Sequence, residues 1–140
     1  PRATVYDVAI VDKYAYLAGG IAGLQIIDIA TPSAPILVGK YNTTGNSIDV
    51  VVNGTNAYIL DNAYDVDGDS ALRIIDVTDP TSPSQVGGYQ ILGRASGLAV
   101  EGNYAYLTSY SNDPPKINPS ATPTRVINKQ ASATPRGFER

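Results

Sequence analysis

Apolar and polar positions recur in the same order in three segments of the chain. The segments, residues 6–18, 48–60 and 96–108, align with one another without gaps. Each has an apolar stretch, a polar turn and then an Ala-Tyr-aliphatic stretch. Short apolar stretches of this length on either side of a polar turn are typical of antiparallel β-strands. The pattern therefore predicts the same pair of strands three times.

A second similarity extends the first two copies. Residues 23–41 align without gaps with residues 71–89, and both contain an Ile-Ile-Asp strand, a loop with two prolines and a further strand. The copies are spaced by 42 and then 48 residues, and the extra six residues all fall between positions 60 and 71. In the first copy, the expected strands are residues 7–11, 14–18, 24–29 and 36–41. Four antiparallel strands in about 40 to 45 residues match the period of a β-propeller blade.

The repeated segments also resemble a known family. GLQIIDIATPSAPILVG (23–39) and ALRIIDVTDPTSPSQVG (71–87), each following a strand of the Ala-Tyr-Leu or Ala-Tyr-Ile type, are similar to the LVIVD repeat. The similarity covers about residues 6–110. It implies a β-propeller of a bacterial or archaeal protein with an extracytoplasmic or cell-surface location. The family brings no catalytic motif, so no functional residue is carried over from it.

The alignments predict an all-β partial propeller of about two and a half blades. The first blade covers residues 1–46, the second covers 47–95 with an acidic insertion at 61–70, and the third has only two strands, at 96–110. Residues 111–140 contain five of the ten prolines and show no sustained period, so we expect a disordered tail there.

Such a chain cannot close a ring, because propellers contain about four to eight blades. Its terminal blades are expected to expose apolar faces and an unpaired strand edge. We therefore expect marginal stability and a tendency to associate. The ring would be completed by further blades of a longer parent protein, which we favour, or by self-association.

The composition excludes several kinds of chemistry. The chain has no Cys, His, Met or Trp, which excludes Ser-His and Cys-His nucleophile systems, disulfides and imidazole metal sites within it. The net charge is −3, and residues 1–110 contain five basic and eleven acidic residues. An acidic body without a basic stripe argues against binding of nucleic acid. No apolar stretch approaches the roughly 20 residues of a membrane helix, so no membrane insertion is expected in this chain.

The acidic insertion is the most distinctive candidate site. Asp65, Asp67 and Asp69 have the Asp-x-Asp-x-Asp spacing that opens calcium-binding loops, and Asp61 lies just before them. These four residues are the predicted calcium ligands. However, the glycine expected at the sixth position of the loop is missing, and Asp76, at the twelfth, aligns with Asp28 of a copy that lacks the loop. The alternative is a solvated hairpin extension made of turn-forming residues.

The recurrent polar and aromatic residues have simpler interpretations. Asp28 and Asp76 recur at the end of the third strand, and we expect them to accept hydrogen bonds from backbone N–H groups of the next turn. Asp7 and Asp49 recur in the first strand and are interpreted as structural. The tyrosines at one aligned position could stack on a sugar or a peptide, but packing between blades is favoured. They are Tyr16, Tyr58 and Tyr106.

Three classes of function remain. The first is a non-enzymatic interaction or scaffold module that binds a protein or glycan partner through its loops. The second is a surface module stabilised by calcium at the acidic insertion. The third, which we favour least, is a part of a propeller enzyme, because fold analogy alone is a poor argument for activity.

Overall fold

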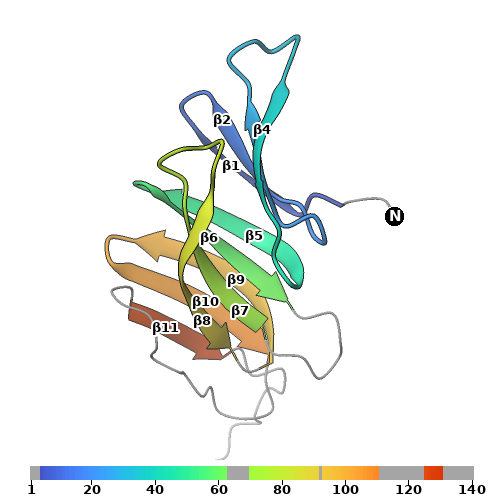
Figure 1. The fold of residues 1–140 in the computed structure, drawn as a ribbon. Coiled ribbons are helices and arrows are strands. Elements are labelled where there is room, and N and C mark those ends of the chain that lie inside the picture. Colours follow the sequence, from blue (N-terminus) through green and yellow to red (C-terminus); the bar gives the residue numbers. More distant parts are fainter. Residues whose placement is uncertain (1–3, 63–69, 92, 111–124, 131–140) are drawn as a thin grey trace, which may run out of the picture.

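The computed structural model of the chain describes residues 4–62, 70–91 and 93–110, and the backbone of residues 125–130. In these residues the strands form three sheets, which we call blades 1, 2 and 3 (Figure 1). Blade 1 contains β1 (Asp7–Val11), β2 (Tyr14–Ala18), β3 (Leu24–Asp28) and β4 (Ile36–Tyr41). Blade 2 contains β5 (Asn46–Asn53), β6 (Asn56–Asn62), β7 (Ser70–Asp76) and β8 (Ser84–Ile91). Blade 3 contains β9 (Arg94–Glu101), β10 (Tyr104–Tyr110) and β11 (Arg125–Gln130). The described part of the chain has no helix that is long and apolar enough to cross a membrane.

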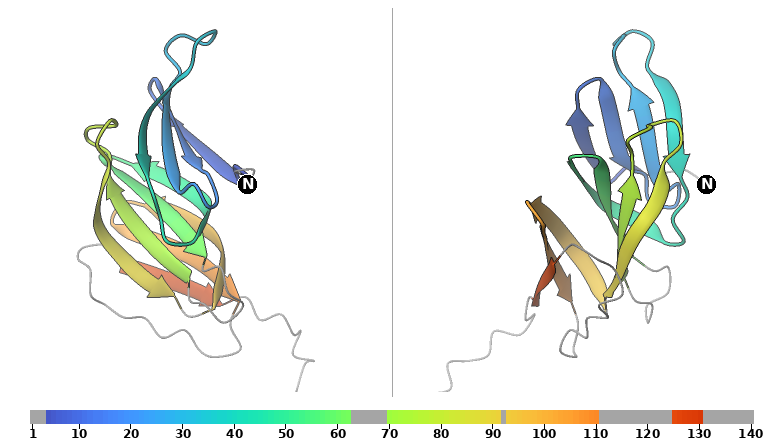
Figure 2. Two further views of the ribbon diagram at one scale, coloured as in Figure 1. Left: turned by 45° about the vertical axis from the view of Figure 1, so that its right-hand side comes forward. Right: turned by 60° about the vertical axis from the view of Figure 1, so that its left-hand side comes forward.

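Blades 1 and 2 are four-stranded antiparallel meanders, in which each strand pairs with the next one along the chain. The four strands expected for the first copy are confirmed, with β3 ending at Asp28. The three sheets stand side by side, and their first strands β1, β5 and β9 are neighbours in space (Figure 2). The fold is therefore the predicted all-β, partial propeller.

The first turn of each blade needs a residue with positive φ. This residue is Gly54 in blade 2 and Gly102 in blade 3, with φ of 61° and 56°. In blade 1 the aligned residue is Asp12, with φ of 54°. Aspartate is one of the few residues other than glycine that adopt this conformation at low cost. The turn is therefore preserved although the residue changes.

The hydrophobic core lies between blades. Successive side chains of a strand point to opposite faces of its sheet, so one blade can contribute to the core on each of its sides. We call the face toward the preceding blade the front face and the other the back face. In β6, Ala57 and Ile59 lie in the cluster shared with blade 1, whereas Tyr58 and Leu60 lie in the cluster shared with blade 3. Both faces of blade 2 are thus buried, which explains why its strands are apolar on both faces.

The recurrent tyrosines confirm this arrangement. Tyr16 and Tyr58 project from back faces, and only 4% and 6% of their surfaces are exposed, against the front face of the next blade. Packing between blades, as expected, accounts for both. Tyr106 occupies the same position in blade 3, and 39% of its surface is exposed.

Two features differ from the predictions. First, the third blade has a third strand, because β11 pairs with β10, and it does so in parallel rather than antiparallel orientation. The free edge of β10 offers unpaired N–H and C=O groups, which explains why a strand from the tail adds there. The rest of the predicted disordered tail, residues 111–124 and 131–140, lies outside the described residues.

Second, the insertion is shorter than its predicted range of 61–70. Asp61 and Asn62 belong to β6, and Ser70 begins β7. All three side chains are buried rather than solvated. They are buried at the connections between blade 2 and its neighbours, where their polar groups have partners: Asp61 bonds to Ser47, and Asn62 and Ser70 bond to Ala95.

Candidate functional site: the seam between blades

Two carboxylates join the first strands of neighbouring blades. Asp7 of β1 accepts a hydrogen bond from the backbone N–H of Val50 in β5, at 3.0 Å. Asp49 of β5 accepts one from the N–H of Leu98 in β9, also at 3.0 Å. The structural role expected for both aspartates is confirmed. The aligned residue of blade 3 is Gly97, which has no carboxylate.

The two carboxyl groups also influence each other. The pKa of Asp49 is raised to about 6, first by burial and then by a hydrogen bond with the Asp7 carboxyl and by repulsion from its charge. The N–H groups of Leu98 and Val50 act in the opposite direction and favour the ionised form. The folded chain therefore prefers Asp49 to be protonated at mildly acidic pH, because two nearby carboxylates are not easily ionised together.

We predict that this pair makes stability depend on pH. Because the pKa of Asp49 is higher in the folded chain than its ordinary 3.8, folding is favoured at low pH and loses this contribution as the pH rises from about 4 to about 7. Asp49→Asn should remove the loss, so its free energy of unfolding, measured by urea denaturation, should vary less with pH in this range than that of the unmodified chain.

Asp76→Asn is a control of opposite sign, because the hydroxyl and N–H of Thr78 lower the pKa of Asp76. The unmodified carboxylate loses its stabilising bonds as the pH falls. Asp76→Asn should therefore reduce the decrease in the free energy of unfolding at acidic pH. The prediction fails if the unmodified chain and Asp49→Asn show parallel pH profiles between pH 4 and 7.

A second connection between neighbouring blades involves Ser47 and Ala95, three residues before Val50 and Leu98 in the same first strands, and it is built differently at the two junctions. Between blades 1 and 2, the backbones of Gly20 and Ser47 exchange two hydrogen bonds of 3.0 Å. Between blades 2 and 3, the side-chain amide of Asn62 takes the place of a peptide group. It accepts from the N–H of Ala95 and donates to its C=O, at 3.1 Å each. Asn62 aligns with Gly20, and Ala95 aligns with Ser47.

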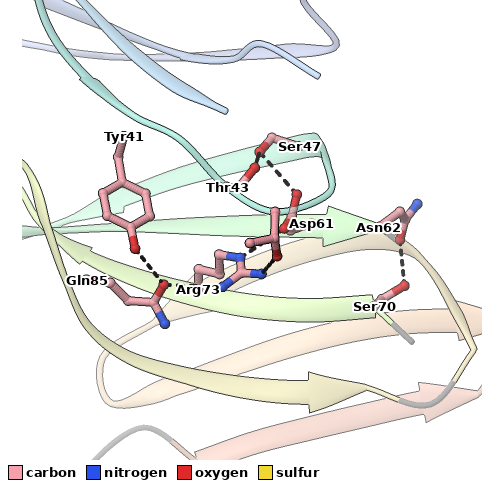
Figure 3. Close-up of polar contacts among 9 residues, drawn as sticks. Tyr41, Thr43, Ser47, Asp61, Asn62, Ser70, Arg73 and Gln85 are labelled. Atoms are coloured by element: carbon pink, nitrogen blue, oxygen red, sulfur yellow. Dashed lines mark hydrogen bonds and ion pairs between the residues drawn. The ribbon is translucent and has the colours of Figure 1, made fainter. Parts of the chain in front are cut away.

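Ser70 completes this second connection. Its hydroxyl lies 2.6 Å from Oδ1 of Asn62 (Figure 3). It also lies 2.7 Å from the carbonyl oxygen of Gly93, and its Oγ accepts from the N–H of Ala95 at 2.9 Å. The first residues of β9 are therefore held by side chains at the facing ends of β6 and β7.

Asp61 and Arg73 of blade 2 form an ion pair (Figure 3). The aligned residues of blade 1, Gly19 and Gln25, cannot form one. Asp61 is 3% exposed, and its Oδ2 accepts from Nε of Arg73 at 2.9 Å. The guanidinium also donates to Thr44 in the connection between blades 1 and 2, at 2.6 Å, and to Gln85 of β8, at 3.3 Å. Gln85 in turn accepts from the hydroxyl of Tyr41 in β4, at 3.1 Å. Arg73 thus ties blade 2 to the end of blade 1.

These contacts define the position of the predicted calcium ligands. The carboxylate of Asp61 is bound by Arg73 and, at 3.4 Å, by the hydroxyl of Ser47. Asp61 lies in β6 and has these two partners, and its predicted role as a calcium ligand stays a prediction. Asp65, Asp67 and Asp69 lie outside the described residues, and calcium binding by them stays a prediction. Among the described residues, no group of three or more acidic side chains could hold a metal ion.

The aspartates at the ends of β3 and β7 behave as expected. Asp28 accepts from the N–H of Ala30 at 2.9 Å, and Asp76 accepts from the N–H of Thr78 at 2.8 Å. The N–H of Ala30 is the main cause that lowers the pKa of Asp28. The hydroxyl of Thr78, and after it the Thr78 N–H, lower the pKa of Asp76. Lys13 adds a salt bridge to Asp28 at 3.3 Å.

Neither the ion pair nor the amide connection was predicted from the sequence. A signal for the pair was present, because blade 1 has Gly19 and Gln25 where blade 2 has Asp61 and Arg73. Two aligned positions that acquire opposite charges in the same copy indicate a contact between them. The role of Asn62 had no comparable signal, since Gly20 makes the equivalent contact through its backbone.

Consecutive antiparallel sheets that pack face to face, with their first strands linked in a series, define a β-propeller, here a partial one. The family model of the LVIVD repeat matches residues 4–43, 44–91 and 92–113. The chain belongs to the LVIVD repeat family. No curated protein and no solved structure matches it.

Proposed function

We propose that the chain is a non-enzymatic interaction or scaffold module of an extracytoplasmic protein, and that it binds a protein or glycan partner through the loops of its blades. Membership of the LVIVD repeat family supports the location, because the resemblance implies a cell-surface protein. The binding proposal rests on the shape and exposure of two loops.

The observation that carries the proposal is a pair of equivalent loops at the same end of consecutive blades (Figure 1). They connect β3 to β4 and β7 to β8, and each begins at an aspartate that fixes the next turn. In the second loop, Asp79 repeats this device with the N–H and hydroxyl of Thr81, at 2.9 and 2.7 Å. The prolines of both loops restrict the backbone further.

Residues 30–35 of the first loop are all exposed, and Ile36 and Leu37 at the start of β4 expose 61% and 54% of their surfaces. Val86, which follows the second loop, is 58% exposed. A loop that is already rigid loses little conformational entropy when it binds, so a partner gains affinity from it. Rigid loops with exposed apolar residues beside them support binding of another macromolecule.

The seam supports the scaffold part of the proposal. Asp7, Asp49 and Asp61 accept hydrogen bonds that connect strands or blades. Asp28 and Asp76 hold turns. These recurrent or buried carboxylates have structural partners, and this use is typical of residues that maintain a framework.

The proposal predicts that charge introduced on the two loops abolishes binding. The labelled chain would be applied to an array of microbial and host glycans and to an array of extracellular proteins. Ser33→Lys combined with Ser82→Lys leaves the aspartate turns intact, and it should lower the signal of a bound probe about tenfold or more, because buried lysines at an interface are costly.

Ile21→Lys combined with Asn42→Lys is the matched control. It adds the same charge at exposed positions on the connections at the opposite end of the blades, and binding should be retained. Absence of binding to either array, or equal loss of signal in the two variants, would contradict the proposal.

A further inference from the structure

The front face of blade 1 carries the same kind of residues as the buried front faces of blades 2 and 3, yet it is exposed. Val8 and Ile10 of β1 are 50% and 63% exposed. Val50, which aligns with Val8, is 3% exposed in the core between blades 1 and 2. Leu98, the third member of this position, packs against the core between blades 2 and 3.

The backbone of β1 also has an N–H group whose aligned counterparts in β5 and β9 bond to another blade. In a hairpin with a two-residue turn, alternate N–H groups point away from the partner strand. Val50 and Leu98 occupy such positions, and each donates its N–H to the aspartate of the preceding blade. Val8 pairs with Leu17 in the register in which Val50 pairs with Ile59. The N–H of Val8 therefore points from β1 to the side where the aspartate of another blade would lie.

The back face of blade 3 has a different character. Gly97 stands where blades 1 and 2 have Asp7 and Asp49, so this face offers no carboxylate. Thr108 replaces the buried Ala18 and Leu60, and its hydroxyl lies 2.9 Å from that of Ser96 on the same face. The third blade of a second copy is therefore a poor match for the front face of blade 1.

We propose that the front face of blade 1 is a docking surface for the back face of another LVIVD blade, one that has an aspartate at the position of Asp7 and a tyrosine at the position of Tyr16. Its aspartate accepts the N–H of Val8, and its tyrosine covers Val8 and Ile10. Continuity with the two seams of the chain supports this occupant, because both seams have these contacts at the same aligned positions. It concerns the blade face and does not depend on ligand binding by the loops.

The test uses an extended chain in which residues 1–47 are followed by residues 6–140. The added blade is then a copy of blade 1, and Tyr6 follows Ser47 as Ile48 does in the unmodified chain. The copy of Asp7 faces the original Val8, and the copy of Gly20 retains its bridge to the copy of Ser47. Amide hydrogen exchange and melting temperature are compared between the extended and the unmodified chain.

We expect the exchange of the original Val8 amide to slow by about tenfold or more and the melting temperature to rise, since each added blade contributes an interface to a repeat array. The matched control changes Asp7 to Gly in the added copy alone, as at position 97. It should keep the added blade folded but return the Val8 amide to fast exchange.

Three outcomes overturn the proposal. The first is an added blade whose amides stay unprotected, because the same sequence folds against blade 2 in the unmodified chain. The second is equal protection of Val8 with and without the aspartate of the added copy. The third is sedimentation of the unmodified chain as a dimer in which Val8 is protected, since the occupant would then be a second copy.

Discussion

Replacing Gly39 with alanine should destabilise the chain by about 3 kcal/mol, because overpacking at a site that cannot relax usually costs this much. Gly39 lies in β4, and a Cβ atom there would overlap the carbonyl oxygen of Pro80 in the loop between β7 and β8. The side chain of Pro83 closes the space from another direction. Blade 1 and the loop of blade 2 would have to separate, so the free energy of unfolding in urea should fall.

Gly54→Ala is the control for the loss of a glycine. Gly54 has a φ of 61°, but a Cβ atom there would have no neighbour within 4 Å. Its substitution should cost only about 1 kcal/mol, from backbone conformation. If Gly39→Ala costs no more than Gly54→Ala, then the outer parts of the blades are not packed as the structure shows.

The strands and the turns could be predicted from the sequence because their signals are local and occur more than once. Asp28 and Asp76 precede similar loops, and an aspartate can reach the N–H two residues ahead in any chain with that backbone. The turn at Asp12 was readable for the same reason, since Gly54 and Gly102 stand at the aligned positions. Repetition allows one copy to test the interpretation of another.

The seam could be predicted only in part, because its partners are distant in the chain. Asp7 and Val50 are 43 residues apart, and their bond depends on how two sheets stack. Recurrence marked Asp7 and Asp49 as structural but did not identify the N–H groups that they bind. The strand β11 was missed for a different reason: its sequence does not resemble the third strands of blades 1 and 2, and it pairs in the opposite direction.

The second prediction with a large effect concerns the ion pair of blade 2. Arg73→Leu should destabilise the chain by about 3 to 5 kcal/mol, because it leaves the carboxylate of Asp61 buried without a cation. Only the long contact with Ser47, at 3.4 Å, would remain to it. The same substitution also removes the bonds to Thr44 and Gln85, which join blade 2 to the end of blade 1. Urea denaturation at neutral pH measures the effect.

The double variant Asp61→Leu and Arg73→Leu separates the charge from the packing. Without either charge, two apolar side chains occupy the seam, and the loss should be smaller than that of Arg73→Leu alone. Gln25→Leu is the control, because Gln25 is the aligned residue of blade 1 and its side chain lies beside Gly19 instead of a carboxylate. Its effect should be within about 0.5 kcal/mol. A double variant as unstable as Arg73→Leu would mean that the bonds from Arg73 to Thr44 and Gln85, and not the buried carboxylate, determine the stability of this seam. A smaller loss would mean that the buried carboxylate without its cation accounts for part of the cost of Arg73→Leu.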